Sequence, residues 1–209
     1  MSSSVSASAK SASYHHGDLR QALIQAARAA LKEKGVDKLS LREVARNTGV
    51  SHAAAYHHFR DKTGLIAAVA VAAFGELETA LRAAPKTNDA LTHFKTLLRV
   101  YITFALKNPD EFRLMFLPQL RSDEVRTEVE AAGRVTYTLI VAALAALQDE
   151  GRLKGDPERA AITAWATAHG LATLMLDGPL YRNAASQAGS EALLTSSTEH
   201  LLSGLVREH

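Results

Sequence analysis

The residues whose types and spacing favour a chemical role are concentrated in residues 40–59, which read SLREVARNTGVSHAAAYHHF. Two short apolar-periodic segments flank Gly49-Val50-Ser51, the spacing of a helix-turn-helix, which places its second helix in the DNA major groove. Gly49 can take the positive φ that ends the first helix, and Ser51 can cap the second. An ordinary helical hairpin with a glycine turn has the same spacing, so spacing alone leaves both interpretations open.

Charge and histidine are unevenly distributed along the chain. Residues 1–62 hold ten Lys/Arg and five Asp/Glu, a net of +5, whereas residues 63–209 hold fourteen and seventeen, a net of −3. Five of the nine histidines also lie in the first part. A basic module joined to a slightly acidic body indicates an anionic partner at one end, although a chance distribution of solvated charge would look the same.

The elements that must position these residues are helical throughout. Residues 1–13, with seven serines, lack an apolar period and predict a flexible tail. Residues 14–62 predict a three-helix DNA-binding domain, and residues 63–209 a larger helical domain. Ser40 and Glu43 form a capping-box pattern. The fold class is all-α, with about nine expected helices; they run over 18–34, 40–48, 51–58, 61–84, 88–107, 110–117, 122–150, 156–176 and 190–206.

The chain resembles the TetR family of bacterial transcriptional regulators. The matching positions comprise residues 40–45, 49–51, Tyr56, 58–59, Lys62 and Leu65, with residues 14–20 as a similar lead-in. Residues 108–116 are similar to a segment of one subgroup, and Trp165, His169 and Gly170 match the Trp-His-Gly signature of its C-terminal domain. Thr48 stands where the family usually has alanine, and Ala53 where it often has glycine. Because Ala53 lies in the expected recognition helix, the DNA sequence preference of relatives cannot be transferred to this chain.

The resemblance implies a homodimer that binds a double-stranded DNA operator, with residues 63–209 as the effector-binding and dimerisation domain. Most contacts to the DNA are expected to reach phosphates. We expect Ser40, Tyr56, His57 and Lys62 to contact phosphates, with Arg20 adding charge. Arg42 and His52 could read guanine, and the methyls of Ala53 and Ala54 could contact thymine. This base-reading set is small, so operator shape is expected to supply much of the specificity. The residues assigned to DNA binding are Ser40, Arg42, Ser51, His52, Ala53, Tyr56, His57 and Lys62.

Histidine titrates near neutral pH, so His52 and His57 predict that DNA binding tightens as the pH falls toward about 6. Packing against the first helix is the alternative for Tyr56 and the favoured interpretation for His58. His15 and His16 are interpreted as solvated tail residues.

Aromatic side chains at helical spacing in the larger domain predict an effector pocket, because the family binds small effectors between these helices. For any one of these residues, a place in the core is the competing interpretation. Arg134 could pair with an anionic effector or, as we favour, with Glu130, and Thr136 is another polar group on an apolar helix. The candidate pocket residues are Phe74, Phe94, Tyr101, Phe112, Met115, Phe116, Tyr137, Trp165 and His169.

The last two long helices are expected to form the dimer interface as a four-helix bundle. One carries a face of small residues and the other an apolar face, and closure of the monomer core is the alternative for both. The candidate interface residues are Ala161, Ala164, Ala168, Ala172, Leu193, Leu201 and Leu205.

Several functional classes find no support in the sequence. The chain has no cysteine, no phosphate-binding glycine loop and no nucleophile elbow, so neither an enzyme nor a cofactor is expected. Adjacent histidines diverge by about 100° on a helix, so no metal site is expected. The longest apolar run, Leu65 to Phe74, is shorter than the about 18 residues of a membrane span, and a cytoplasmic protein is expected. The alternative function is a helical ligand-binding or oligomeric interaction protein without a DNA role.

Overall fold

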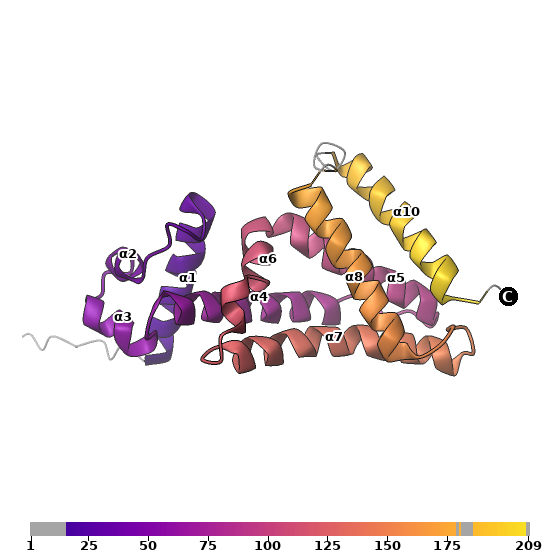
Figure 1. Ribbon diagram of the computed structural model, residues 1–209, viewed down its shortest axis with the longest axis horizontal. Coiled ribbons are helices and arrows are strands. Elements are labelled where there is room, and N and C mark those ends of the chain that lie inside the picture. The colour runs from indigo at the N-terminus through magenta and orange to yellow at the C-terminus, as the bar shows by residue number, and fades with distance from the viewer. Residues whose placement is uncertain (1–15, 179, 181–185, 208–209) are drawn as a thin grey trace, which may run out of the picture. The chain divides into compact units, whose positions relative to one another are not determined.

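The computed structural model describes residues 16–178, 180 and 186–207, and the expected tail at residues 1–13 lies outside them. Nine α-helices and one 3-10 helix make up this described part, joined by turns and one isolated bridge, which confirms the all-α prediction (Figure 1). The chain divides into two compact units, residues 1–61 and 62–209.

The first unit is a three-helix domain. Its helices are α1 (His16–Lys34), α2 (Leu41–Asn47) and α3 (His52–His58). The apolar stripe of α1, including Leu23, Ala27 and Leu31, is buried together with Val44 of α2 and Phe59 after α3. This shared core holds the two short helices in place, because helices of seven residues are not stable alone in water.

The second unit contains the longer helices. They are α4 (Lys62–Arg82), α5 (Ala90–Lys107), α6 (Pro109–Met115), the 3-10 helix η1 (Pro118–Arg121), α7 (Arg126–Asp149), α8 (Pro157–Leu176) and α10 (Gln187–Leu205). Helix α4 packs against α5, α6, η1 and α7. By length and composition alone α4 and α7 could cross a membrane, but core helices of soluble proteins pass the same test, and α4 has ten buried residues here.

Helix α10 lies beside α8 and also contacts α5 (Figure 1). Its end is fixed to the turn after α7, where Lys154 donates its backbone N–H to Leu205 O at 2.7 Å and Arg207 donates to Arg152 O at 2.8 Å. An ion pair between Arg99 of α5 and Glu191 also joins α10 to the unit. The C-terminal helix is therefore held at both the turn and its flank.

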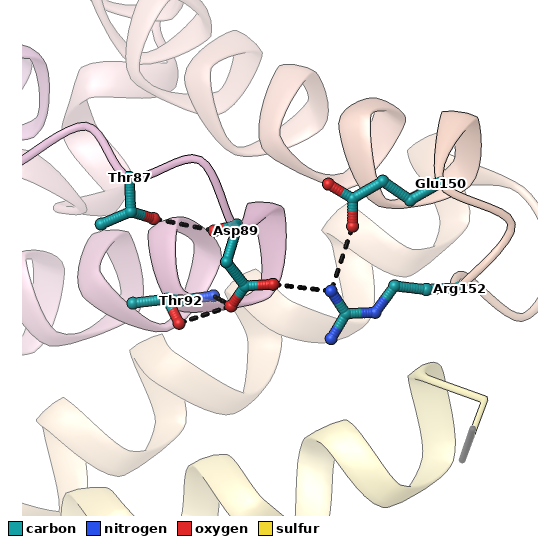
Figure 2. Close-up of polar contacts among 5 residues, drawn as sticks. All are labelled: Thr87, Asp89, Thr92, Glu150 and Arg152. Atoms are coloured by element: carbon teal, nitrogen blue, oxygen red, sulfur yellow. Dashed lines mark hydrogen bonds and ion pairs between the residues drawn. The ribbon is translucent and has the colours of Figure 1, made fainter.

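A polar cluster joins the start of α5 to the turn after α7 (Figure 2). Asp89 is the N-cap of α5 and accepts from Thr92 N at 2.9 Å, while its other oxygen lies 2.6 Å from Arg152 Nη1. Arg152 Nη1 also donates to Glu150 at 3.0 Å, and Thr87 donates to the Asp89 carbonyl at 2.8 Å. One cap residue thus stabilises a helix start and an interhelical turn together.

Two local predictions need correction. Ser40 is the N-cap of α2, but its side chain makes no capping hydrogen bond, and the Glu43 carboxylate pairs with Lys34 of α1 and lies 3.8 Å from Arg46, so the expected capping box does not form. The helix expected over 122–150 begins at Arg126, since Ser122 O accepts turn hydrogen bonds from Val125 N and Arg126 N after the 3-10 helix.

Candidate functional site: a recognition helix and a ligand cavity

The turn before α3 has the geometry that the sequence predicts. Gly49 has φ +72°, which a residue with a side chain rarely adopts. Val50 donates its N–H to Ala45 O at 3.1 Å and closes the turn. Ser51 is the N-cap of α3, and its hydroxyl accepts from Ala54 N at 3.1 Å. The predictions of a glycine exit and a serine cap are therefore confirmed.

One face of α3 is open to solvent. Ser51, His52, Ala53, Tyr56 and His57 are exposed, whereas Ala55 on the opposite face is fully buried in the unit. Tyr56 is 45% exposed, which is unusual for a large aromatic residue, and its ring lies 4.5 Å from the His52 ring, centroid to centroid. The exposed face thus offers two imidazoles, a phenol and a methyl group to a partner, while His58 is half-buried.

Two other predicted DNA-binding residues lie at the start of α2 in the same unit, Ser40 as its N-cap and Arg42 within the helix. Ser40, Arg42 and His52 line one hollow of about 540 Å³, together with Arg46. Lys62 is the half-buried first residue of α4, in the second unit. The Arg20 guanidinium lies over the Phe59 ring, with Cζ 5.4 Å from the centroid, so this residue stabilises the core edge of the first unit through a cation–π contact.

The second unit contains a cavity of about 630 Å³ between α4, α5, α7, α8 and the segment that joins α6 to α7. This volume is in the range of pockets that hold small molecules. Six predicted pocket residues line it, and these are Phe74, Tyr101, Met115, Phe116, Tyr137 and Trp165. Gly133 adds space, because a Cβ there would lie 3.4 Å from the Phe74 ring.

Three predicted pocket residues do not line the cavity. Phe94 is fully buried in the core, which corrects its assignment. Phe112 and His169 lie behind the cavity wall, where the Phe112 ring centroid is 5.3 Å from those of both Phe116 and His169. Both residues therefore support lining residues and do not face the cavity themselves.

A hydrogen-bonded group of aromatic residues crosses the cavity wall. The Tyr101 hydroxyl accepts from Trp165 Nε1 at 3.3 Å and lies 3.0 Å from His169 Nδ1. Burial raises the pKa of Tyr101, so the phenol stays protonated at neutral pH. Burial also lowers the pKa of His169, which favours a neutral imidazole as its partner.

Sequence reasoning missed much of the cavity wall. Four residues spaced along one side of α7 line the cavity, and these are Val129, Gly133, Tyr137 and Ile140. Their helical spacing was the available sequence signal for this part of the wall. Among the residues that the structure describes, Glu130 and Arg134 do not form the ion pair that we favoured, although both line the cavity. The lining residues outside the list of candidate pocket residues are Leu81, Leu98, Leu117, Leu120, Arg121, Arg126, Val129, Glu130, Gly133, Arg134, Thr136, Ile140, Ile162 and Ala168.

The expected dimer face needs a partial correction. Ala161, Ala164, Ala168 and Ala172 are at most 4% exposed inside the isolated subunit, where α8 packs against α5 and α7. Small side chains there allow close helix packing within the monomer. The exposed side of α8 instead carries Ile162, which is 56% exposed and also borders the cavity, and Leu174, which is 44% exposed. On α10, Leu193, Leu201 and Leu205 are half-buried in the subunit.

No group of three or more histidine, aspartate or glutamate side chains that could hold a metal ion occurs within residues 16–178, 180 and 186–207. The charged residues that line the cavity are exposed.

Two family models match the chain. One, described as "Bacterial regulatory proteins, tetR family", matches residues 23–69, which include α2 and α3. The other, described as "Tetracyclin repressor-like, C-terminal domain", matches residues 94–200, about half of the chain and much of the cavity wall.

Individual proteins are similar to the chain over different lengths. A structure of a protein with unknown function from Rhodococcus sp. RHA1 is 34% identical, with a TM-score of 0.78 over 94% of this chain and 100% of that one. A putative tetR family transcription regulator from Shewanella sp. PV-4 is 19% identical, with a TM-score of 0.68 over 90% of this chain and 98% of that one, and so shares the fold.

The curated relatives match over a short segment only. The HTH-type transcriptional regulator BetI of Yersinia pestis is 45% identical over 49 residues, which are 23% of this chain and 25% of the relative. The chain therefore matches about a quarter of the length of these relatives. The family models nevertheless match both units, the segment with the recognition helix and the segment with the cavity. The chain belongs to the TetR family of bacterial regulatory proteins.

Proposed function

We propose that this protein is a sequence-specific transcriptional regulator that binds a palindromic operator as a homodimer and releases it when a small molecule occupies the cavity. The exposed face of α3, with His52, Ala53, Tyr56 and His57 beside the Gly49 turn, is the observation that carries the proposal. Membership of a family of regulatory proteins points to a role other than catalysis. Operator binding places the protein in the cytoplasm, and repression is the action we propose.

The roles of the DNA-binding residues follow from their side chains. Arg42 and His52, which line the same hollow, are proposed to donate to guanine, and Ala53 to contact a thymine methyl. Ser40, Ser51, Tyr56, His57 and Lys62 are proposed to hold phosphates and fix the register. Because few side chains reach bases, deformability of the operator supplies further specificity.

The outward apolar face of α8 supports the proposed dimer. Ile162 and Leu174 are large apolar residues exposed on one helix, with Ala166 between them. Exposed apolar groups gathered on one face mark protein–protein contacts. Helix α10 lies beside α8, so Leu193, Leu201 and Leu205 can extend the same interface. A two-fold axis through these helices would give two recognition helices for one palindrome.

A substitution on α8 tests the dimer. Ile162→Asp places a charge in the proposed interface, and loss of such a central apolar contact costs roughly 2 kcal/mol or more, about 30-fold in dimer affinity. Sedimentation velocity at micromolar protein is expected to give a monomer for this variant and a dimer for the wild type. Ala142→Asp on the exposed side of α7 is the control. A dimeric Ile162→Asp variant would place the interface elsewhere.

Release of the operator on ligand binding is proposed to act through α4. Phe74 and Leu81 of this helix line the cavity, and α4 begins at Lys62, directly after the DNA-binding unit in the chain. A ligand that binds better to one position of α4 shifts the population of DNA-competent dimers.

Selection from a random duplex library tests the DNA-binding proposal. The purified protein is expected to enrich an inverted repeat and to bind it far more tightly than a scrambled duplex at about 0.15 M salt, where non-specific binding is weak. An enriched sequence that binds no better than the scrambled duplex would contradict the proposal and favour the helical interaction protein without a DNA role.

A further inference from the structure

The polar side chains of the inner cavity wall direct their hydrogen bonds to the protein itself. Thr136 donates to Gly133 O at 2.7 Å, and the Tyr137 hydroxyl donates to Glu158 O at 3.1 Å. Tyr101 is engaged by Trp165 on the same wall and by His169 behind it. Groups whose hydrogen bonds are already made offer little to a polar ligand atom, so this part of the cavity favours an apolar body.

The charged groups that line the cavity are exposed and lie at its rim. They are Arg121 of η1 and Arg126, Glu130 and Arg134, which follow one another at four-residue spacing along α7. Arg126 pairs with Asp123 at 3.0 Å. Among the described residues, the side chains of Arg121, Glu130 and Arg134 have no ion pair or hydrogen bond with another residue.

The charges at this rim do not balance. Once Asp123 offsets Arg126, two guanidinium groups face a single carboxylate, and one positive charge remains without a counter-charge. Guanidinium groups bind carboxylates through paired, charge-assisted hydrogen bonds. A ligand with one negative charge at the rim and an apolar body inside therefore matches both parts of the cavity.

We propose that the cavity binds an organic monoanion, a carboxylate carried on an apolar chain or ring system. Its carboxylate lies at the rim near Arg121 and Arg134, and its body lies against Phe74, Phe116 and Trp165. This inference names the ligand class of the proposed effector site. Only the role of that ligand as an effector rests on the proposed function.

Trp165 provides the readout, because it is the only tryptophan of the chain and lines the cavity. Its fluorescence is titrated with two matched series of probes, decanoate, 1-decanol and decylammonium, and biphenyl-4-carboxylate with its alcohol and ammonium counterparts. A charge-assisted pair favours the carboxylate by about tenfold or more over its uncharged counterpart in at least one series. Equal or tighter binding of the alcohol or ammonium in both series, or no binding of any carboxylate, overturns the proposal.

Two variants locate the charge. Arg134→Gln is expected to weaken carboxylate binding about tenfold and leave alcohol binding unchanged. Arg159→Gln, an exposed arginine of α8 outside the cavity, is the matched control and is expected to bind like the wild type. The proposal is overturned if the carboxylate affinity is unaltered both in Arg134→Gln and in the double variant Arg121→Gln/Arg134→Gln.

Operator binding separates this inference from the proposed function. A carboxylate that binds the cavity without releasing the operator leaves the ligand class intact and contradicts release. Release by the alcohols or ammonium probes alone leaves release intact and contradicts the ligand class.

Discussion

The recognition helix and the cavity are built over very different distances along the chain. The turn and caps that shape α3 involve residues within a few positions of one another, such as Val50 with Ala45 and Ser51 with Ala54. The cavity brings together Phe74 of α4, Tyr137 of α7 and Trp165 of α8. The DNA-reading surface can therefore be changed residue by residue without unfolding, whereas the cavity depends on how distant helices pack.

The largest expected effect tests the packing of the second unit. Phe94→Ala removes a fully buried ring and is expected to lower the free energy of unfolding by about 3–5 kcal/mol. Urea denaturation followed by Trp165 fluorescence measures it. Phe116→Ala is the matched control, and it should cost clearly less because the half-buried Phe116 ring already borders the cavity. Equal losses would mean that both rings belong to one core.

The next effect concerns the exposed surface of the first unit. Arg42→Ala is expected to weaken operator binding by about 1–3 kcal/mol, roughly 5- to 150-fold, and to leave the urea midpoint unchanged. Fluorescence anisotropy with the selected operator measures the affinity. Arg159→Ala changes an arginine on α8 and serves as the control. A variant that loses stability together with affinity would contradict the separation between reading surface and fold.

Two glycines sharpen the comparison at the level of the backbone. Gly49→Ala places a side chain at φ +72° and is expected to lower stability by about 1–2 kcal/mol. Gly75 lies within α4, where an added Cβ would meet nothing within 4 Å, so Gly75→Ala should raise stability by about 0.5–1 kcal/mol. Thermal unfolding followed by circular dichroism compares them. Shifts of the same sign would refute the role given to the turn.

The smallest expected effect at neutral pH is that of Asp89→Asn, because asparagine caps a helix as well as aspartate does and the ion pair with Arg152 that it removes involves a half-exposed carboxylate. Hydrogen bonds from Thr92 and Arg152 hold the pKa of Asp89 well below its usual value. The unfolded state therefore takes up the proton first, and stability from this charge is lost as the pH falls below about 4. Urea midpoints between about pH 5 and 2.5 should fall more steeply for the wild type. Parallel curves would show that the ion pair is not formed in solution.

The sequence predicted local features well because their causes are local. Gly49 and Ser51 each act through neighbours within a few residues, and the structure has both of them as expected. The Ser40–Glu43 capping box was wrong because Lys34, in another helix, competes for the carboxylate. Helical spacing held a local signal for the cavity face of α7 as well, but only Tyr137 of that face was assigned to the pocket.

Long-range features were less predictable. An alanine face such as that of α8 suits close packing against any partner, and the sequence alone does not distinguish α5 and α7 from a second subunit. Phe94 and Phe116 have the same side chain, and only the positions of the neighbouring helices place one in the core and the other at the cavity. Residue types thus indicated a ligand-binding unit, while packing decided which residues form its wall.

Binding to a selected inverted repeat, to a duplex with one half-site scrambled, and to a fully scrambled duplex tests the central claim most directly. At about 0.15 M salt we expect two subunits on the inverted repeat, much weaker binding to the single half-site, and only non-specific binding to the scrambled duplex. Equal affinity for all three duplexes would contradict a dimeric, sequence-specific regulator.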